Sequence, residues 1–299
     1  MKITNNQGLP LAIFNACDPN KHNAENTLSA TTLLHGTKDI ILTNRHWDEM
    51  EDDCSNRIYA LLGTAAHSIF ENEEDKPSVI KENQFSVKVG NKYTVTGRID
   101  RYDTETGEIG DYKTTSVYKV MSESYEEWYK QLMIYAWLLK QNGHNPKKAV
   151  IYAILRDWSK LEAKRKAGQG YPANQTKVIT FDITDKDMGF IEDFIRTKVK
   201  EVEECELLPD NEIPACTAKE RWEKPAKFAV MKEGRKTAVK LFDTEDEANT
   251  FLTSITKEKD KHYIEQRKSA SPRCAEYCGC CKYCNFYKEN VEVLIEESA

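Results

Sequence analysis

Two aspartates and a lysine near the middle of the chain have the types and spacing that metal-assisted hydrolysis requires. Asp100 ends the β-like run YTVTGRID, and after the turn TETG the run EIGDYKT carries Asp111 and Lys113. Side chains two residues apart on a strand point to the same face, so Asp111 and Lys113 would act at one place. Carboxylate oxygens with a backbone carbonyl, here that of Tyr112, suit Mg²⁺ or Mn²⁺. The neighbouring ammonium group could align a water molecule that the metal activates.

The residues around this group predict strands that would bring Asp100 next to Asp111. Turn signals at Asn91 and Gly107 separate three strand-like runs and predict a meander. Apolar residues at helical spacing predict helices before and after it. The predicted strands cover 84–89, 93–100, 108–114, 149–158 and 177–183, and the predicted helices cover 48–72, 123–142 and 185–206. The order from residue 48 to 183 is therefore α-β-β-β-α-β-β.

Four short motifs follow one another in an order that a known family shares. They are GTAAH ending at His67, GRID ending at Asp100, the triplet Asp111-Tyr112-Lys113, and Gln131-x-x-x-Tyr135. With these motifs the sequence resembles a PD-(D/E)XK nuclease of the RecB-like branch, similar to CRISPR-associated RecB-like exonucleases and their bacteriophage relatives. The resemblance covers about residues 28–200. Any one motif is weak, and the four in order are specific.

The resemblance implies an α/β fold with a restriction-endonuclease-like core, in which helices flank a central mixed sheet. It implies a metal-dependent DNA exonuclease whose products carry a 5′-phosphate and a 3′-hydroxyl. The implied metal ligands are His67, Asp100, Asp111 and the carbonyl of Tyr112, and the implied catalytic residues also include Lys113, Gln131 and Tyr135. Taken alone, His67 could be a packing residue and Tyr135 a core residue. The spacing of Glu71 and Glu82 does not single them out.

Composition shifts predict four parts along the chain. They are an N-terminal helical segment at 1–47, the nuclease core at 48–210, a small ββα insertion at 217–262, and a cysteine cluster with its tail at 263–299, to which Cys216 is added. The insertion is predicted from a hairpin with Gly234 in its turn and from a helix that Thr244 begins. Its role is open from the sequence.

Five of the nine cysteines lie within eleven residues near the C-terminus, which favours metal ligation over disulfides in a reducing compartment. In the family, three C-terminal cysteines and a distant upstream one bind a [4Fe–4S] cluster. The upstream stretch LLHGTKD lacks a cysteine here, so the fourth ligand is open between Cys216, Cys54, Cys280 and Cys281. We take Cys216 first, with Cys274, Cys278 and Cys284. A structural Zn²⁺ is the alternative.

Charge and hydropathy limit the kinds of partner that we expect for this protein. The net charge is −6, yet residues 147–177 carry eight Lys/Arg against Asp157 and Glu162, together with Trp158 and Tyr171. Cations mixed with aromatic rings suit single-stranded DNA, or a duplex end. The sequence contains no run long enough to cross a membrane and does not begin like a signal peptide, so we expect a cytoplasmic protein, in the host cytoplasm if a phage encodes it.

Two other functions use the same residues. One is a structure-specific endonuclease on the same core, and the other is a non-catalytic DNA-binding subunit of a helicase–nuclease complex. A zinc-finger-like binding module would explain the cysteines and leave the carboxylates unexplained. The sequence has no Walker-type glycine loop, so ATP-driven activity would come from a recombination or helicase partner. The oligomeric state is open from the sequence.

Overall fold

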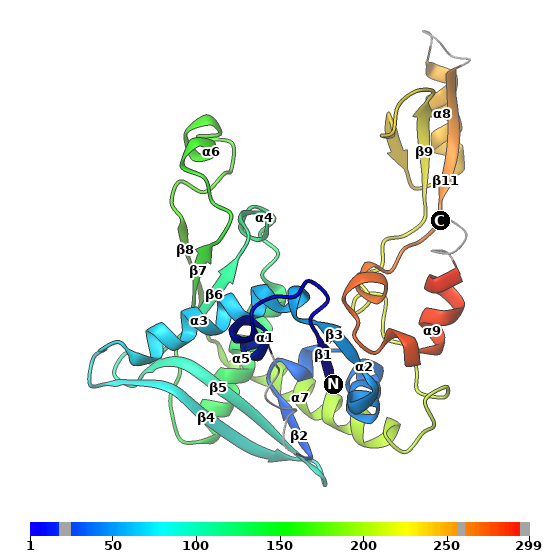
Figure 1. The fold of residues 1–299 in the computed structure, drawn as a ribbon. Coiled ribbons are helices and arrows are strands. Elements are labelled where there is room, and N and C mark those ends of the chain that lie inside the picture. The colour runs from blue at the N-terminus through cyan, green and yellow to red at the C-terminus, as the bar shows by residue number, and fades with distance from the viewer. Residues whose placement is uncertain (18–24, 256–260, 294–299) are drawn as a thin grey trace. The chain divides into compact units, whose positions relative to one another are not determined.

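The computed structural model describes residues 1–17, 25–255 and 261–293, and the chain divides into two compact units. The first unit contains Met1–Ile41 and Trp47–Leu208, and the second contains Leu42–His46 and the chain from Pro209 onward. The first unit is a mixed sheet flanked by helices, and the second combines a small sheet with the cysteine-rich C-terminus (Figure 1). The four-part division predicted from the sequence remains a prediction beside these two units.

The first unit holds most of the regular structure. Its strands are β1 (Lys2–Thr4), β2 (Thr27–Ser29), β3 (Glu51–Asp53), β4 (Val79–Val89), β5 (Tyr93–Asp103), β6 (Glu108–Thr115), β7 (Lys148–Leu155) and β8 (Thr176–Asp182). Its helices are α1 (Leu11–Cys17), α3 (Ile58–Asn72), α4 (Val117–Met121), α5 (Glu126–Gln141), α6 (Lys160–Arg165) and α7 (Asp185–Cys205), and α2 (Thr37–His46) begins in this unit and ends in the second.

Three strands pair with β5. The candidate site lies where the pairing between β5 and one of them, β6, ends. β4 pairs antiparallel along almost all of β5. The other edge is shared, because β2 runs parallel to Thr94–Thr96 while β6 pairs antiparallel with Arg101–Asp103. The β6 ladder stops at Arg101, so Asp100 lies where β6 separates from β5. β7 continues the sheet parallel to β6, and β8 pairs antiparallel with β7.

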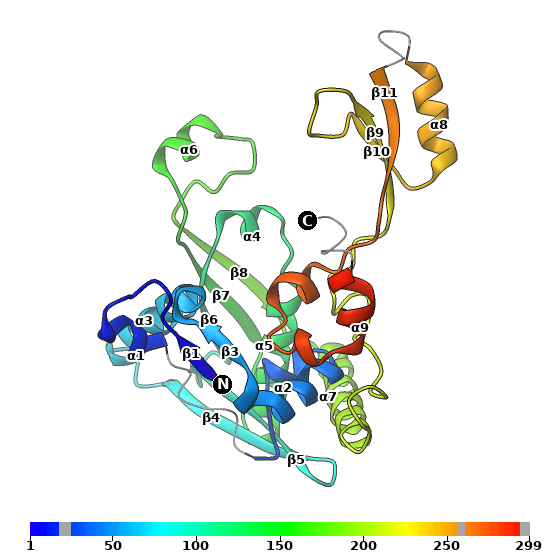
Figure 2. The same ribbon diagram turned by 45° about the vertical axis from the view of Figure 1, so that its right-hand side comes forward.

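Helices cover the two faces of β6. Lys113 on β6 contacts Gln131 of α5. The ring of Tyr112, the residue before it, packs against Phe70 of α3. Since neighbouring residues of a strand point to opposite faces, α3 and α5 lie on opposite sides of β6. Residues 131–139 of α5 are all buried, because α7 packs on its outer side (Figure 2). α5 also provides the crossover that the parallel pair β6–β7 requires.

Gly97 allows α5 to approach β5 closely. A Cβ atom there would lie 2.6 Å from Cδ1 of Leu138 and 3.0 Å from the ring of Tyr135. A larger residue would therefore push the helix away from the strand. The close approach holds the ring of Tyr135 beside the sheet, with the residue only 6% exposed.

One predicted helix differs strongly in extent. The helix predicted at 48–72 begins only at Ile58. The residues before it, Glu51–Asp53, pair parallel with Lys2–Thr4 at the start of the chain. Asp53 then caps a short turn by accepting a hydrogen bond from the backbone N–H of Ser55 at 3.0 Å. This long-range strand pairing competes with helix formation and is absent from the local pattern of apolar residues.

The second unit contains a three-stranded antiparallel sheet in the order β10-β9-β11 and one covering helix. The elements are β9 (Lys227–Lys232), β10 (Lys240–Phe242), α8 (Glu245–Ser254), β11 (His262–Arg267) and α9 (Asn285–Tyr287). The hairpin and helix predicted for the insertion are present, and β11 is an additional strand. Thr244 begins α8 through a capping box with Glu247, as its sequence predicts.

In the part of the chain that the structure describes, no helix combines the length and apolar character needed to span a membrane.

Candidate active site

The carboxylate of Asp100 bonds to β6 at the point where β6 leaves β5. Asp100 Oδ2 accepts a hydrogen bond from the backbone N–H of Tyr112 at 2.8 Å, and the residue is 7% exposed. The carboxylate thereby satisfies a donor that a continued ladder would have paired with a carbonyl group. Its other oxygen, Oδ1, lies 3.4 Å from Nδ1 of His67. The meander thus brings Asp100 to β6, as the sequence predicts.

Asp111 and Lys113 form a partly buried ion pair on the α5 face of β6. Lys113 Nζ lies 3.1 Å from Oδ1 and 2.9 Å from Oδ2 of Asp111, which is 1% exposed. Only the Oδ1 contact has hydrogen-bond geometry, so Oδ2 is one of the few buried side-chain oxygens among the described residues without a hydrogen bond. A buried carboxylate oxygen left in this way can accept a further ligand, such as a metal ion.

Gln131 and Tyr135 extend this pair onto α5. Gln131 Oε1 accepts a hydrogen bond from Lys113 Nζ at 3.1 Å, and its Nε2 donates to the hydroxyl of Tyr135 at 2.7 Å. The same Nε2 lies 3.5 Å from Oδ1 of Asp111. Because residues four apart share one face of a helix, both α5 side chains reach the same point. Gln131 and Asp111 therefore hold the ammonium group of Lys113 between two oxygen acceptors.

His67 approaches from α3 and connects both strands. Its Nε2 lies 3.0 Å from the carbonyl oxygen of Tyr112. Its Nδ1 faces two carboxylates, Asp100 and, at 3.5 Å, Oε1 of Glu82 on β4. One ligand atom each from His67, Glu82 and Asp100 lie within 4.8 Å of one another, and Asp111 does not belong to this group. The predicted residues therefore converge, but as two adjoining clusters.

The charges of the two clusters shift the pKa values of their members. The hydrogen bond to Asp100, with the charge of Glu82 in addition, raises the pKa of His67 to about 9 although burial opposes it. Burial raises the pKa of Asp111 to about 6 against the opposing ammonium of Lys113. Burial, followed by the charge of Asp111, also raises the pKa of Tyr135. Without metal at neutral pH, His67 is an imidazolium whose two N–H groups face oxygen acceptors.

Glu82 is the residue of this site that the sequence analysis did not single out. The predicted strand began at residue 84, whereas β4 begins at Val79. The ladder between β4 and β5 puts Glu82 opposite Asp100, with both equally distant from Asn91 in the turn. Extending the meander backwards by this symmetry could have found it. The carboxylate of Glu71, which is on α3 itself, lies instead 3.2 Å from Nη2 of Arg98.

The cysteines predicted as ligands gather in the second unit. Burial is the first cause that raises the pKa of Cys274 to about 12, followed by the thiolates of Cys278, Cys216 and Cys284, while the guanidinium of Arg221 lowers it. This mutual influence means that the four sulfurs lie near one another. Among the described residues, Cys278 belongs to a group of three possible ligand atoms that lie within 4.8 Å of one another. Cys216, Cys274 and Cys284 belong to no such group in the part of the chain that the structure describes. The four sulfurs are thus spaced more widely than the tetrahedron around one Zn²⁺, where they would be about 4 Å apart.

The other candidate cysteines differ in position. Cys280 is 1% exposed and its Sγ lies 3.5 Å from Sγ of Cys278. Burial, followed by the charge of Cys278, raises the pKa of Cys281. Cys54 belongs to the first unit, where its Sγ contacts Oδ1 of Asn5 at 3.4 Å. The local cysteines therefore remain alternatives as ligands, while Cys54 has a packing role of its own.

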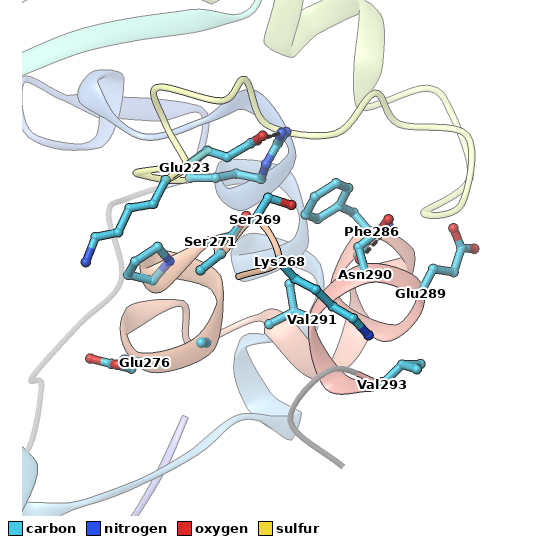
Figure 3. Close-up of a pocket in the computed structure, with 15 residues that line it drawn as sticks. Glu223, Lys268, Ser269, Ser271, Glu276, Phe286, Glu289, Asn290, Val291 and Val293 are labelled. Atoms are coloured by element: carbon cyan, nitrogen blue, oxygen red, sulfur yellow. Dashed lines mark hydrogen bonds and ion pairs between the residues drawn. The ribbon is translucent and has the colours of Figure 1, made fainter. Parts of the chain in front are cut away.

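A pocket of about 1020 Å³ lies in the second unit (Figure 3). Its walls come from the residues after Arg221, from Lys268–Pro272 and from the helical segment at Phe286–Val293. The guanidinium of Arg221 lies 4.2 Å from the ring centroid of Phe286. The lining mixes both signs of charge with apolar groups, and it contains none of the residues that converge on β5 and β6.

Comparison with known proteins gives one family. The profile that describes the PD-(D/E)XK nuclease superfamily matches residues 22–287 of the chain. No curated protein matches the chain.

Several solved structures resemble part of the chain. A protein named SSO0001 is 17% identical with a TM-score of 0.41, over 63% of this chain and 83% of its own. A phage-related exonuclease from Haemophilus somnus is 12% identical with a TM-score of 0.39, over 60% and 95%. An alkaline exonuclease from Laribacter hongkongensis is 10% identical with a TM-score of 0.38, over 60% and 89%. At these TM-scores none of the matches bears on the activity of this chain.

Proposed function

Because this chain belongs to the PD-(D/E)XK nuclease superfamily, we propose that it is a metal-dependent DNA exonuclease acting on single strands or duplex ends. The observation that supports this most is the convergence of Asp100, the Asp111–Lys113 pair and His67 from three different elements. A protein that only binds DNA has no need for a buried carboxylate beside an ammonium group. We further propose a role in recombination, replication or repair of bacterial or phage DNA.

One or two divalent cations would be held at this convergence by His67, Asp100, Asp111 and the carbonyl group of Tyr112. When bound, Mg²⁺ or Mn²⁺ polarises a phosphate and lowers the pKa of a coordinated water. Asp111 Oδ2 is buried and lies 2.9 Å from the ammonium group of Lys113 without a hydrogen bond, and it is the carboxylate oxygen that such a cation would take. Asp100 keeps one oxygen for the cation because the N–H of Tyr112 occupies the other.

Lys113 would align the attacking water and screen the negative charge that builds up on the phosphate. Its Nζ is held between Asp111 and Gln131, so the ammonium keeps one position while the substrate binds. Tyr135 fixes the amide of Gln131 through its hydroxyl, and thereby supports Lys113 indirectly. Preorganised groups of this kind stabilise developing charge without the cost of reorienting during the reaction.

The cysteine cluster is proposed as a [4Fe–4S] site with Cys216, Cys274, Cys278 and Cys284 as ligands. The resemblance to RecB-like nucleases supports iron over zinc, and the influence of Cys278, Cys216 and Cys284 on the pKa of Cys274 supports this set of ligands. Such a group would join Cys216 to the C-terminal cysteines, which are separated from it in the sequence by the strands of the second unit. A purified protein without visible absorbance and with one Zn²⁺ per chain would reverse this assignment.

Incubating the purified protein with end-labelled single- and double-stranded DNA tests the function. With Mn²⁺ or Mg²⁺ we expect release of nucleotides or short products from ends, and with EDTA we expect none. Internal cuts in circular DNA would show an endonuclease instead. If the protein binds DNA but hydrolyses none with either metal, it is a non-catalytic DNA-binding subunit and the proposal is wrong.

Cations around α6 are proposed to contact the DNA backbone. Lys164, Arg165 and Lys166 end this helix, and Glu162 lies 2.6 Å from Nη2 of Arg165 and 3.0 Å from Nζ of Lys166. Changing all three cations to Glu should weaken binding of single-stranded DNA about 10-fold or more near 0.1 M salt. The slope of log K against log salt should fall by about 2, since each phosphate contact to a single strand contributes about 0.7. Fluorescence anisotropy in EDTA measures both without cleavage.

A matched control uses three cations on α7. Lys186, Arg196 and Lys200 are exposed, and two of them also pair with a Glu on the same helix. Changing them to Glu alters the net charge equally, so a local contact predicts near-parental binding. Equal weakening by both triple variants would mean that only the overall charge matters, and unchanged binding by the α6 variant would remove that helix from the DNA path.

A further inference from the structure

The surroundings of His67 contain a carboxylate that the proposed ligand set leaves out. We propose that Glu82 is a direct ligand of the divalent cation, at a position formed with Nδ1 of His67 and Oδ1 of Asp100. This inference rests on the proposed function, because it adds a ligand to the same active site. It assigns a residue of β4, so the cation would connect β4, β5 and α3.

The orientation of the His67 ring is the first support. Its Nε2 lies 3.0 Å from the carbonyl oxygen of Tyr112, and as an N–H it donates to that oxygen. Histidines that bind metals usually donate their other ring N–H to a carbonyl or carboxylate, which fixes the ring. The nitrogen left for a metal is therefore Nδ1. That nitrogen points to Glu82 and Asp100, and not to the Asp111–Lys113 pair.

The distances fit a hexacoordinate cation. Nδ1 lies 3.5 Å from Oε1 of Glu82 and 3.4 Å from Oδ1 of Asp100, and the three ligand atoms lie within 4.8 Å of one another. A cation bonded at about 2.1 Å to each ligand keeps adjacent ligands about 3 Å apart. Small side-chain movements would therefore close the three atoms around one ion.

Glu82 is held with one oxygen directed to this point. Arg98 Nε contacts Oε2 at 2.7 Å, while Oε1 faces His67, and the Glu82 side chain is only 11% exposed. The backbone of Glu82 has a φ of 48° in the middle of β4, where it interrupts the pairing opposite Asp100. A non-glycine residue in the left-handed region costs about 1 kcal/mol or more. The fold keeps this strained residue where a carboxylate reaches His67, although Gly or Asn would fit the backbone better.

Mn²⁺ binding to the metal-free protein, measured by isothermal titration calorimetry without DNA, tests the inference. We expect Glu82→Gln to raise the Kd for Mn²⁺ at least about 10-fold. Glu71→Gln is the matched control, because Glu71 also forms an ion pair with Arg98 and stands outside the group of three ligand atoms. Its Kd should stay within about twofold of the parent value.

A second variant guards against misfolding. Glu82→Asn removes the carboxylate but tolerates the left-handed backbone, so it should fold at least as well as the parent and bind Mn²⁺ as weakly as Glu82→Gln. Parental Kd values in either folded variant overturn the inference, as does a parent protein that binds no Mn²⁺. Hydrolysis is scored separately. A parent that binds Mn²⁺ without cutting DNA refutes the proposed function, while the comparison of variants still decides the role of Glu82.

Discussion

Replacing Asp111 by Asn is expected to lower DNA hydrolysis by about 10³-fold while the protein stays folded and still binds DNA. The variant loses the charge that would hold the cation and keep Lys113 in place. An amide of the same shape still offers Lys113 an oxygen acceptor, so the packing around β6 and α5 is retained. Single-turnover cleavage of end-labelled DNA in Mn²⁺ measures the loss, and parental rates would refute the role of Asp111.

The same substitution should not reduce stability, and its pH dependence has a defined sign. Because burial raises the pKa of Asp111 from its ordinary 3.8 to about 6, the ionised carboxylate opposes folding above about pH 6. Asn removes that cost, so without metal the free energy of unfolding at pH 8 should equal or exceed that of the parent. The advantage should shrink as the pH falls below 6 and disappear below about pH 3, where Asp111 is protonated in both states. Urea unfolding in EDTA at several pH values measures it.

Asp103→Asn is the matched control for both measurements. Asp103 is 2% exposed and belongs to the same meander, but its Oδ1 accepts a hydrogen bond from the N–H of Glu105 at 3.0 Å. Burial acts to raise the pKa of Asp103, yet backbone hydrogen bonds, first that from Glu105, lower it overall. This carboxylate stabilises the fold above its unfolded pKa, so its loss should lower stability at pH 8 and leave cleavage near the parental rate. Equal losses of activity in both variants would indicate a general defect.

Replacing Cys278 by Ser is expected to remove the bound metal and the ordered structure of the second unit together. A structural metal contributes on the order of 10 kcal/mol to the fold that holds it, and a hydroxyl group is a poor substitute for a thiolate. Cys278 lies among the cluster sulfurs and 3.5 Å from Sγ of Cys280. Metal analysis, the visible absorbance and limited proteolysis of the chain after Pro209 measure the loss.

Cys205→Ser separates this effect from a general need for cysteine. Cys205 ends α7 in the first unit, and burial, followed by Glu201 and Glu204, raises its pKa. This variant should keep parental metal content and protease resistance. If Cys278→Ser also keeps both, the cysteines do not form a metal site with Cys278 as a ligand. If Cys216→Ser keeps both while Cys278→Ser loses them, the fourth ligand is a local cysteine, either Cys280 or Cys281.

Local pattern was enough to predict the elements that carry most of the candidate site. The strand predicted at 108–114 is β6 at Glu108–Thr115, and the helix predicted at 123–142 is α5 at Glu126–Gln141. The spacing of apolar residues that indicates a strand or a helix involves residues close together in the chain, so a single sequence shows it. Elements that exist through distant pairing were missed or misjudged, among them the strand Glu51–Asp53, which depends on Lys2–Thr4.

The sequence by itself determined which chemical groups are available and which of them share a face, because those relations follow from strand and helix geometry. Asp111 with Lys113, and Gln131 with Tyr135, are pairs of this kind. Only the tertiary structure decided that Asp100 bonds the N–H of Tyr112 and that Nδ1 of His67 faces Glu82. These contacts depend on where one ladder stops, how closely α5 and α3 approach the sheet, and one strained backbone angle. Such features arise from packing between distant segments, which spacing along the chain does not encode.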